Sequence, residues 1–165
     1  MSDVVWRQGD WSMDILGRTV ECSCDVRTLA NGRRGLREVV YSTTRSRKPG
    51  VAYDPMVFPV GLWLLTSVEV TDPPNPYLGP KFIRTDAYQK VEEWAVTQDG
   101  SDVVEYEAPT GRYVFDYGYL LHFSTSPTTL GCLKIHSLND MLWLCDCVEM
   151  ALREGRDMTL RVLAA

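Results

Sequence analysis

Hydrophobic and polar residues alternate along much of the chain, which is the pattern of β-strands buried on one face. The longest alternation covers residues 113–123, where an aromatic row begins at Tyr113 and Phe115 and continues through Tyr117 and Tyr119. We interpret this row as part of the core. The expected strands cover residues 11–15, 19–26, 59–70, 81–85, 113–123 and 159–162, with a hairpin over 91–107. The pattern therefore predicts a mainly β fold.

Turn signals separate these strands without dividing the chain into domains. The segment Asp72-Pro73-Pro74-Asn75-Pro76 is expected to be irregular, because proline has no backbone N–H to donate. No internal repeat or low-complexity linker is visible, and 165 residues suit one domain. We expect a single domain over residues 1–165, with the N-terminal hairpins of residues 1–50 integral to it.

One principal helix is predicted over about residues 137–154, followed by the C-terminal strand. Ser137 is a suitable N-cap, and Asp140 lies three residues later, as in a capping box. Gly155 is placed to end the helix. Apolar residues follow helical spacing at Met141, Leu144, Cys145, Val148 and Leu152.

The composition is that of a globular protein and narrows the range of partners. Hydrophobic residues make up 45% of the chain and charged residues 24%, which argues against a disordered chain. The net charge of −5 makes general nucleic-acid binding unfavourable. No apolar run approaches the ~20 residues that a membrane-spanning helix needs, so we expect no integral membrane segment.

The N-terminal residues 1–7 lack a basic region followed by an apolar core, so we expect synthesis in the cytoplasm without a cleavable signal peptide.

Residues 31–50 form a basic region in an otherwise acidic chain. Two interpretations remain open: a solvated surface, or a patch that meets an anionic partner. Its basic residues are Arg33, Arg34, Arg37, Arg45, Arg47 and Lys48.

Five cysteines, an odd number, argue against a disulfide framework. Cys22 and Cys24 share one face of a strand and are expected to be buried. Cys145 and Cys147 lie about 200° apart around a helix, so they are poorly placed to hold one zinc ion together. His136, between a strand and the helix, is interpreted as a surface or capping residue.

The most reactive combination in the sequence is His122 with Cys132, ten residues later. A nearby imidazole can deprotonate a thiol for attack on a carbonyl group. Gly131 permits a tight turn before the thiol, and backbone amides at such a turn can bind an oxyanion. Asp116 is not counted as a third member of this site. A backbone carbonyl is an alternative partner for the imidazole that a sequence pattern does not reveal.

The segment Leu121-His122, followed by Thr129-Leu130-Gly131-Cys132-Leu133-Lys134, resembles the signature of the L,D-transpeptidase family. That signature has a histidine, a variable loop, and Ser/Thr-His-Gly-Cys followed by an aliphatic and often a basic residue. Upstream, Phe58-Pro59-Val60-Gly61-Leu62-Trp63 is similar to the family's entry strand. The chain departs from the family at Leu130, where a second histidine is usual, and at Phe123, where Gly or Ser is usual.

The resemblance implies an L,D-transpeptidase-like β-sandwich or β-rich catalytic domain without a metal or organic cofactor. Cys132 is then the nucleophile and His122 the base. The amides of Gly131 and Cys132 are oxyanion donors, and Thr129 shapes the loop. The implied substrate is the tetrapeptide stem of peptidoglycan, attacked before its terminal D-alanine. Water, a D-amino acid or a second stem remain open as acyl acceptors.

The short loop between His122 and Cys132 looks most like small effectors of this family that the type VI secretion system delivers to the periplasm of competing bacteria. The resemblance therefore implies secretion machinery and an immunity protein as partners. Two alternatives remain open. The first is a catalytically degenerate protein of the same fold that binds peptidoglycan or a partner protein, which the Leu130 departure motivates. The second is a binder of anionic polymers through the basic region.

Overall fold

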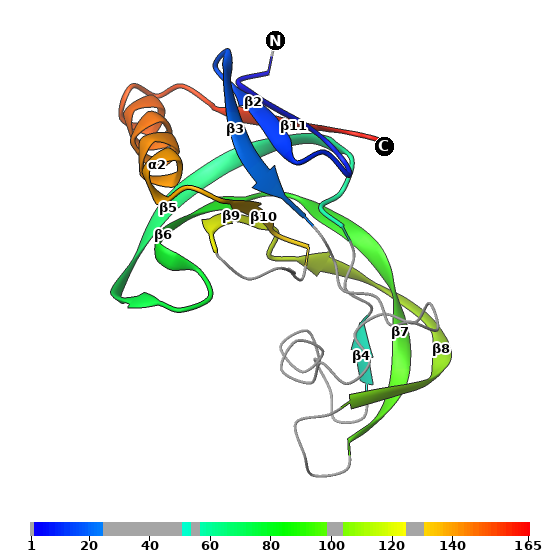
Figure 1. Cartoon of the computed structure of the whole chain (residues 1–165). Coiled ribbons are helices and arrows are strands. Elements are labelled where there is room, and N and C mark those ends of the chain that lie inside the picture. Colours follow the sequence, from blue (N-terminus) through cyan, green and yellow to red (C-terminus); the bar gives the residue numbers. More distant parts are fainter. Residues whose placement is uncertain (1, 25–50, 54–56, 99–103, 125–130) are drawn as a thin grey trace. The chain divides into compact units, whose positions relative to one another are not determined.

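A computed structural model of the chain describes residues 2–24, 51–53, 57–98, 104–124 and 131–165. The chain divides into two compact units, which are described separately. The first unit contains residues 1–25, 57–88 and 117–165, and the second contains residues 26–56 and 89–116. Strands dominate the described residues of both units, and these residues contain one helix, so the mainly β fold class is confirmed (Figure 1).

The first unit is a closed barrel of eight strands in the order β1-β11-β5-β6-β9-β10-β3-β2. The expectation was a β-sandwich or β-rich domain; the β-rich character is confirmed, and the strands close into a barrel. The pairs β1–β11 and β9–β10 are parallel, and the other paired strands with a resolved register are antiparallel. The strands are β1 (Val4–Arg7), β2 (Ser12–Ile15), β3 (Arg18–Ser23), β5 (Gly61–Asn75), β6 (Gly79–Thr85), β9 (Leu120–Phe123), β10 (Leu133–Ile135) and β11 (Thr159–Leu163).

Period-two alternation directs one side of each strand into the barrel core, as predicted for β3 and β11. Val20 and Cys22 of β3 are fully buried there, as are Leu160 and nearly all of Val162 of β11. Trp11, expected to share the face of Met13 and Ile15, instead precedes β2 and is 62% exposed. The buried apolar side chains of the other strands complete one contiguous cluster.

Helix α2 (Leu138–Arg153) packs against β5, β6, β9 and β10, and appears in orange beside the barrel (Figure 1). The Ser137 hydroxyl accepts a hydrogen bond from the amide of Asp140 at 3.3 Å, which confirms the expected N-cap. Gly155 adopts φ +70° just beyond the helix, as a helix-ending glycine does. Leu152, expected on the buried face, is 41% exposed, and the buried face ends one residue earlier at Ala151.

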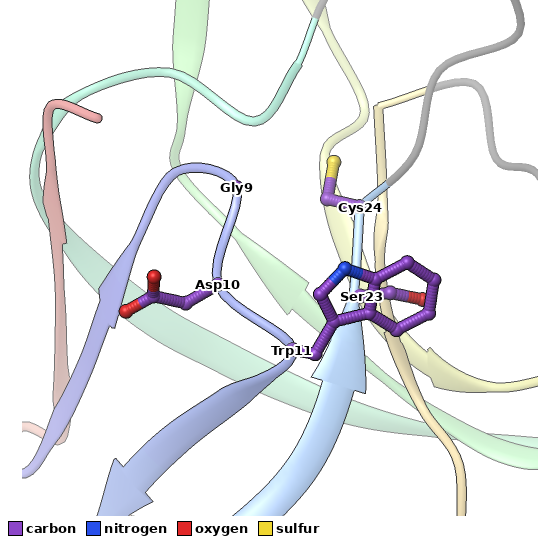
Figure 2. Close-up of a pocket in the computed structure, with 5 residues that line it drawn as sticks. All are labelled: Gly9, Asp10, Trp11, Ser23 and Cys24. Carbon is purple, nitrogen blue, oxygen red and sulfur yellow. The ribbon is translucent and has the colours of Figure 1, made fainter.

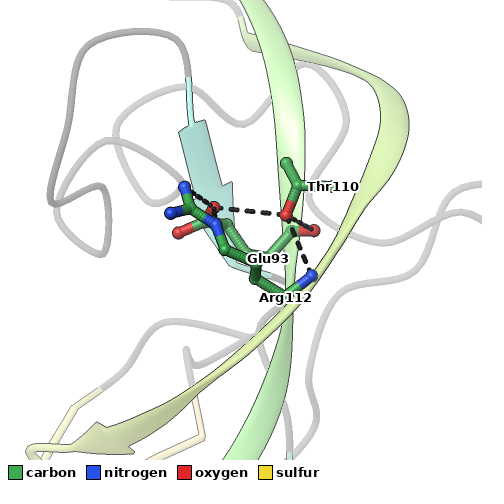
Figure 3. A network of polar contacts seen from close by, with 3 residues as sticks. All are labelled: Glu93, Thr110 and Arg112. Atoms are coloured by element: carbon green, nitrogen blue, oxygen red, sulfur yellow. Dashed lines mark hydrogen bonds and ion pairs between the residues drawn. The ribbon is translucent and has the colours of Figure 1, made fainter.

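The second unit holds most of a three-stranded sheet with the order β4-β7-β8. Its strands are β4 (Val51–Tyr53), β7 (Tyr88–Gln98) and β8 (Val104–Tyr117), so the expected hairpin is confirmed. Glu93 of β7 is 2% exposed and is neutralised by Arg112, whose Nε and Nη2 donate to Oε1 at 3.1 and 2.7 Å (Figure 3). The Thr110 hydroxyl donates to the same oxygen at 3.2 Å.

The prediction of one continuous strand over residues 113–123 is wrong, because two strands cover this segment. β8 ends at Tyr117 and β9 begins at Leu120, because Gly118 between them adopts φ +94°, a conformation outside the strand region. The aromatic row divides at the same point. Tyr113, Phe115 and Tyr117 are each more than half exposed, so their assignment to the core is wrong, whereas Tyr119 is fully buried.

The expectation that residues 72–76 are irregular is wrong for most of the segment, because β5 extends to Asn75. The register with β6 is interrupted between Val70 and Asn75, so the prolines fall where no regular ladder bond is required. Thr71 bridges this interruption. Its hydroxyl donates to the Gly79 carbonyl at 2.5 Å and accepts from the Asn75 amide at 3.1 Å.

Candidate functional site

Cys132 lies immediately before β10, where the chain joins the strand that pairs with β9. Its sulfur accepts a hydrogen bond from the Leu120 amide at 3.4 Å and donates one to the Gly118 carbonyl at 3.7 Å. Leu120 is the first residue of β9, and Gly118 lies in the turn just before it. An N–H directed at sulfur favours the negative charge of a thiolate. The thiol is therefore held at one end of a strand by two backbone groups.

His122 lies on β9, two residues beyond Leu120, and is 6% exposed. Its Nδ1 atom lies 3.2 Å from the backbone oxygen of Phe123. A carbonyl oxygen only accepts, so this contact assigns the proton to Nδ1 and leaves Nε2 as the basic nitrogen. The backbone carbonyl that the sequence could not reveal is thus supplied by the residue next to the histidine.

The strand register places Cys132 and His122 at diagonal positions on neighbouring strands. β9 and β10 are parallel, and His122 lies opposite Lys134, two residues beyond Cys132. The intervening pair, Leu121 and Leu133, faces the barrel core. His122 and Lys134 therefore face the other side of the barrel wall, because successive side chains alternate. The backbones of Cys132 and His122 are therefore one diagonal step apart on two neighbouring strand ends.

Burial is the main cause that lowers the pKa of His122, since the surroundings disfavour the charged imidazolium. The Lys134 ammonium lowers it further by repulsion, while the hydrogen bond to the Phe123 carbonyl acts in the opposite direction. A histidine with a lowered pKa is neutral at pH 7, which is the form that accepts a proton.

The pair His122–Lys134 belongs to a row of buried side chains that crosses four strands. Phe82 of β6 lies opposite His122, and Ser23 of β3 lies opposite Lys134. All four residues are less than one-tenth exposed. A buried ammonium beside a buried imidazole is expensive to maintain, because both charged forms lose hydration. Titratable groups whose pKa is shifted by burial, as that of His122 is, are concentrated at functional sites.

Ser23 and His136 form a second polar pair at the other edge of this row. The Ser23 hydroxyl lies 2.8 Å from His136 Nε2, and the indole of Trp11 packs edge-on against the imidazole with ring centroids 5.8 Å apart. His136 was interpreted as a surface or capping residue, but it is only partly exposed and contacts both side chains. No sequence signal predicts this pair, since Ser23 and His136 are 113 residues apart.

Cys22 and Cys24 are buried, as expected. Burial raises the pKa of both Cys22 and Cys145 to about 12, and it also raises the pKa of Cys147. None of the five cysteines, all within the described ranges, forms a disulfide. Among the described residues, no group of three or more His, Cys, Asp or Glu side chains is arranged to hold a metal ion.

Gly131, the candidate oxyanion residue before the thiol, adopts φ +112°, a conformation that L side chains rarely adopt. Thr129 and Leu130 lie outside the described residues, as do the basic residues between Arg33 and Lys48. In the part of the chain that the structure describes, no helix is long and apolar enough to cross a membrane.

Comparison with protein-family models, with curated proteins and with solved structures finds no match to this chain.

Proposed function

We propose that the chain is a cysteine-dependent acyl-transfer enzyme, with Cys132 as the nucleophile and His122 as the base. The observation that carries the proposal is the diagonal placement of these two residues on paired parallel strands, with His122 Nδ1 hydrogen-bonded to the Phe123 carbonyl. A nucleophile, a base and a group that orients the base form the minimal set for this chemistry.

The motif around His122 and Cys132 supports a specific substrate class, the tetrapeptide stem of peptidoglycan. In this reaction the Cys132 thiol transfers its proton to His122 Nε2, and the sulfur attacks the carbonyl carbon before the terminal D-alanine. The amides of Gly131 and Cys132 are candidates to stabilise the oxyanion. The C–N bond then breaks, and the D-alanine amine leaves with the proton held by His122.

The resulting thioester passes its acyl group to water or to an amine. His122, neutral again, takes a proton from the acceptor as it attacks, and the Cys132 thiol is regenerated. Water as acceptor gives a carboxypeptidase, whereas a D-amino acid or a second stem gives a transpeptidase.

We further propose that the protein acts in the periplasm of a target bacterium, and that export behind an added signal peptide is toxic to a host cell only when Cys132 is intact.

The direct test is incubation of the purified protein with tetrapeptide stems, followed by mass spectrometry of the products. Wild-type protein is expected to release D-alanine, while Cys132→Ala abolishes release and His122→Ala reduces it by about 10²–10⁴-fold. Cys147→Ala, which changes a partly exposed helix thiol outside the site, is the matched control. Release of D-alanine by folded Cys132→Ala at the wild-type rate contradicts the proposal.

A further inference from the structure

We infer that the small pocket at the end of β3, whose Cys24 is hydrogen-bonded to Gly131, binds the free carboxylate and small side chain of the terminal residue that leaves in the reaction. This assignment rests on the proposed function, because it names the part of the acyl donor that the pocket recognises. Figure 2 shows the pocket, lined by Gly9, Asp10, Trp11, Ser23 and Cys24.

The pocket is directly connected to the residue before the nucleophile. The thiol of Cys24 donates a hydrogen bond to the Gly131 carbonyl at 3.2 Å, and Gly131 is bonded to Cys132. Cys24 follows β3, which pairs with β10 on the edge opposite β9. The pocket and His122 therefore lie on opposite sides of β10, the strand that follows Cys132. A substrate bound across the start of β10 has space for its leaving residue on the β3 side.

The size of the pocket restricts the group that it accepts. Its volume of about 100 Å³ is smaller than the ~150 Å³ cavity that accommodates benzene. It therefore suits a methyl side chain with a carboxylate better than a long or aromatic side chain. The indole of Trp11 supplies an apolar wall, and the ring of His136 supports that wall at 5.8 Å.

Ser23 is the group that recognises the carboxylate. Its side chain belongs to the pocket lining although the residue is only 2% exposed. When His136 Nε2 donates to the Ser23 oxygen at 2.8 Å, the hydroxyl proton remains available to a ligand oxygen. Lys134, opposite Ser23 on β10, adds positive charge to the same row. Asp10 is acidic, but its side chain points away from Trp11, Ser23 and Cys24 (Figure 2).

Two tetrapeptide stems that differ only at the C-terminus test this assignment, one with a free carboxylate and one with a primary amide. Wild-type protein is expected to prefer the free acid by at least about tenfold in kcat/KM, mainly through KM. Ser23→Ala and His136→Gln should reduce this preference to less than about threefold. Ser23→Thr, which keeps the hydroxyl, should retain it, and Ser67→Ala on β5 is the matched control.

The outcomes separate this inference from the proposed function. Cys132-dependent turnover with equal rates on acid and amide, or an unchanged preference in both Ser23→Ala and His136→Gln, overturns the inference and leaves the proposed function standing. Absence of turnover with wild-type protein overturns the proposed function and the leaving-residue assignment together.

Titration of Cys132→Ala with N-acetyl-D-alanine and its amide then tests the pocket alone. A shift of the Trp11 indole resonance with the acid, and not with the amide, supports carboxylate recognition, whereas no shift with either overturns it.

Discussion

His122 lies directly opposite Lys134 in the parallel pairing of β9 with β10, and both side chains are more than nine-tenths buried. The ammonium and the imidazole face the same side of the barrel wall. Their repulsion, added to the cost of burying charge, keeps His122 neutral at pH 7. This relationship is the basis of the first two predictions.

The acid limb of the pH profile of kcat/KM is expected to have an apparent pKa below the 6.5 of an ordinary histidine, because burial and Lys134 lower the pKa of His122. Lys134→Met removes the charge and keeps the aliphatic stem, so it should move the acid limb to higher pH. Lys134→Arg keeps the charge and should leave the limb near its wild-type position. An acid limb above pH 6.5, or one unmoved by Lys134→Met, contradicts this electrostatic account.

Stability should also depend on the protonation of His122. The pKa is lowered in the folded state, so between that value and 6.5 the unfolded chain binds more protons than the native one. The free energy of unfolding therefore falls as the pH drops below 6.5, and this loss is complete below the folded-state pKa. Urea unfolding of wild type and His122→Gln at pH 7 and pH 5 measures the effect. The wild type should lose more stability over this interval, and an equal loss in both proteins would exclude His122 as its source.

Alkylation should distinguish Cys132 from the buried structural thiols. Because burial raises the pKa of Cys22 and Cys145 to about 12, both should resist iodoacetamide at pH 7.5 in the folded protein. Cys132, whose proposed base is the neutral imidazole of His122, is expected to react first, and His122→Ala should slow its reaction alone. Peptide mapping over time measures each rate. If Cys22 or Cys145 reacts as fast as Cys132, the nucleophile has been assigned to the wrong thiol.

Glu93 offers a stability test in the second unit. Its buried carboxylate accepts two hydrogen bonds from Arg112, so Arg112→Ala removes two charge-assisted hydrogen bonds from a buried charge. The Arg112 side chain is 60% exposed, and solvent screening limits the expected loss to about 1–2 kcal/mol in the free energy of unfolding.

The matched control for this substitution is Arg156→Ala, because both partners of the Arg156–Glu154 ion pair are more than half exposed. Its effect should stay within about 0.5 kcal/mol. Urea unfolding followed by circular dichroism measures both variants. Equal effects of the two substitutions would show that burial of Glu93 does not set the strength of its interaction with Arg112.

The sequence predicted the strands and helix ends that depend on residues close together in the chain. Period-two alternation identified β3 and β11, and Ser137 with Gly155 marked the helix ends, because these patterns depend on neighbours in the chain. The break at Gly118 was missed, since a glycine inside an alternating pattern is compatible with either a strand or a turn.

The surroundings of the candidate site depend on register between distant strands, and alternation alone does not determine register. The spacing of His122 and Cys132, and the motif around them, identified both residues as candidates. The sequence did not reveal that Lys134 is buried opposite His122, or that Ser23 meets His136. Both relationships arise because β10 pairs with β3 on one side and with β9 on the other. The register of these pairs depends on the packing of the whole barrel.

The most direct test of the central claim is the mass of the intact protein during reaction with a tetrapeptide stem, quenched in acid. The proposed mechanism predicts a transient species heavier than the protein by the stem without its terminal D-alanine. Peptide mapping should locate the added mass at Cys132, and the species should be absent in Cys132→Ala. Release of D-alanine without an adduct on Cys132 at any time point, together with full activity of Cys132→Ala, would contradict the account.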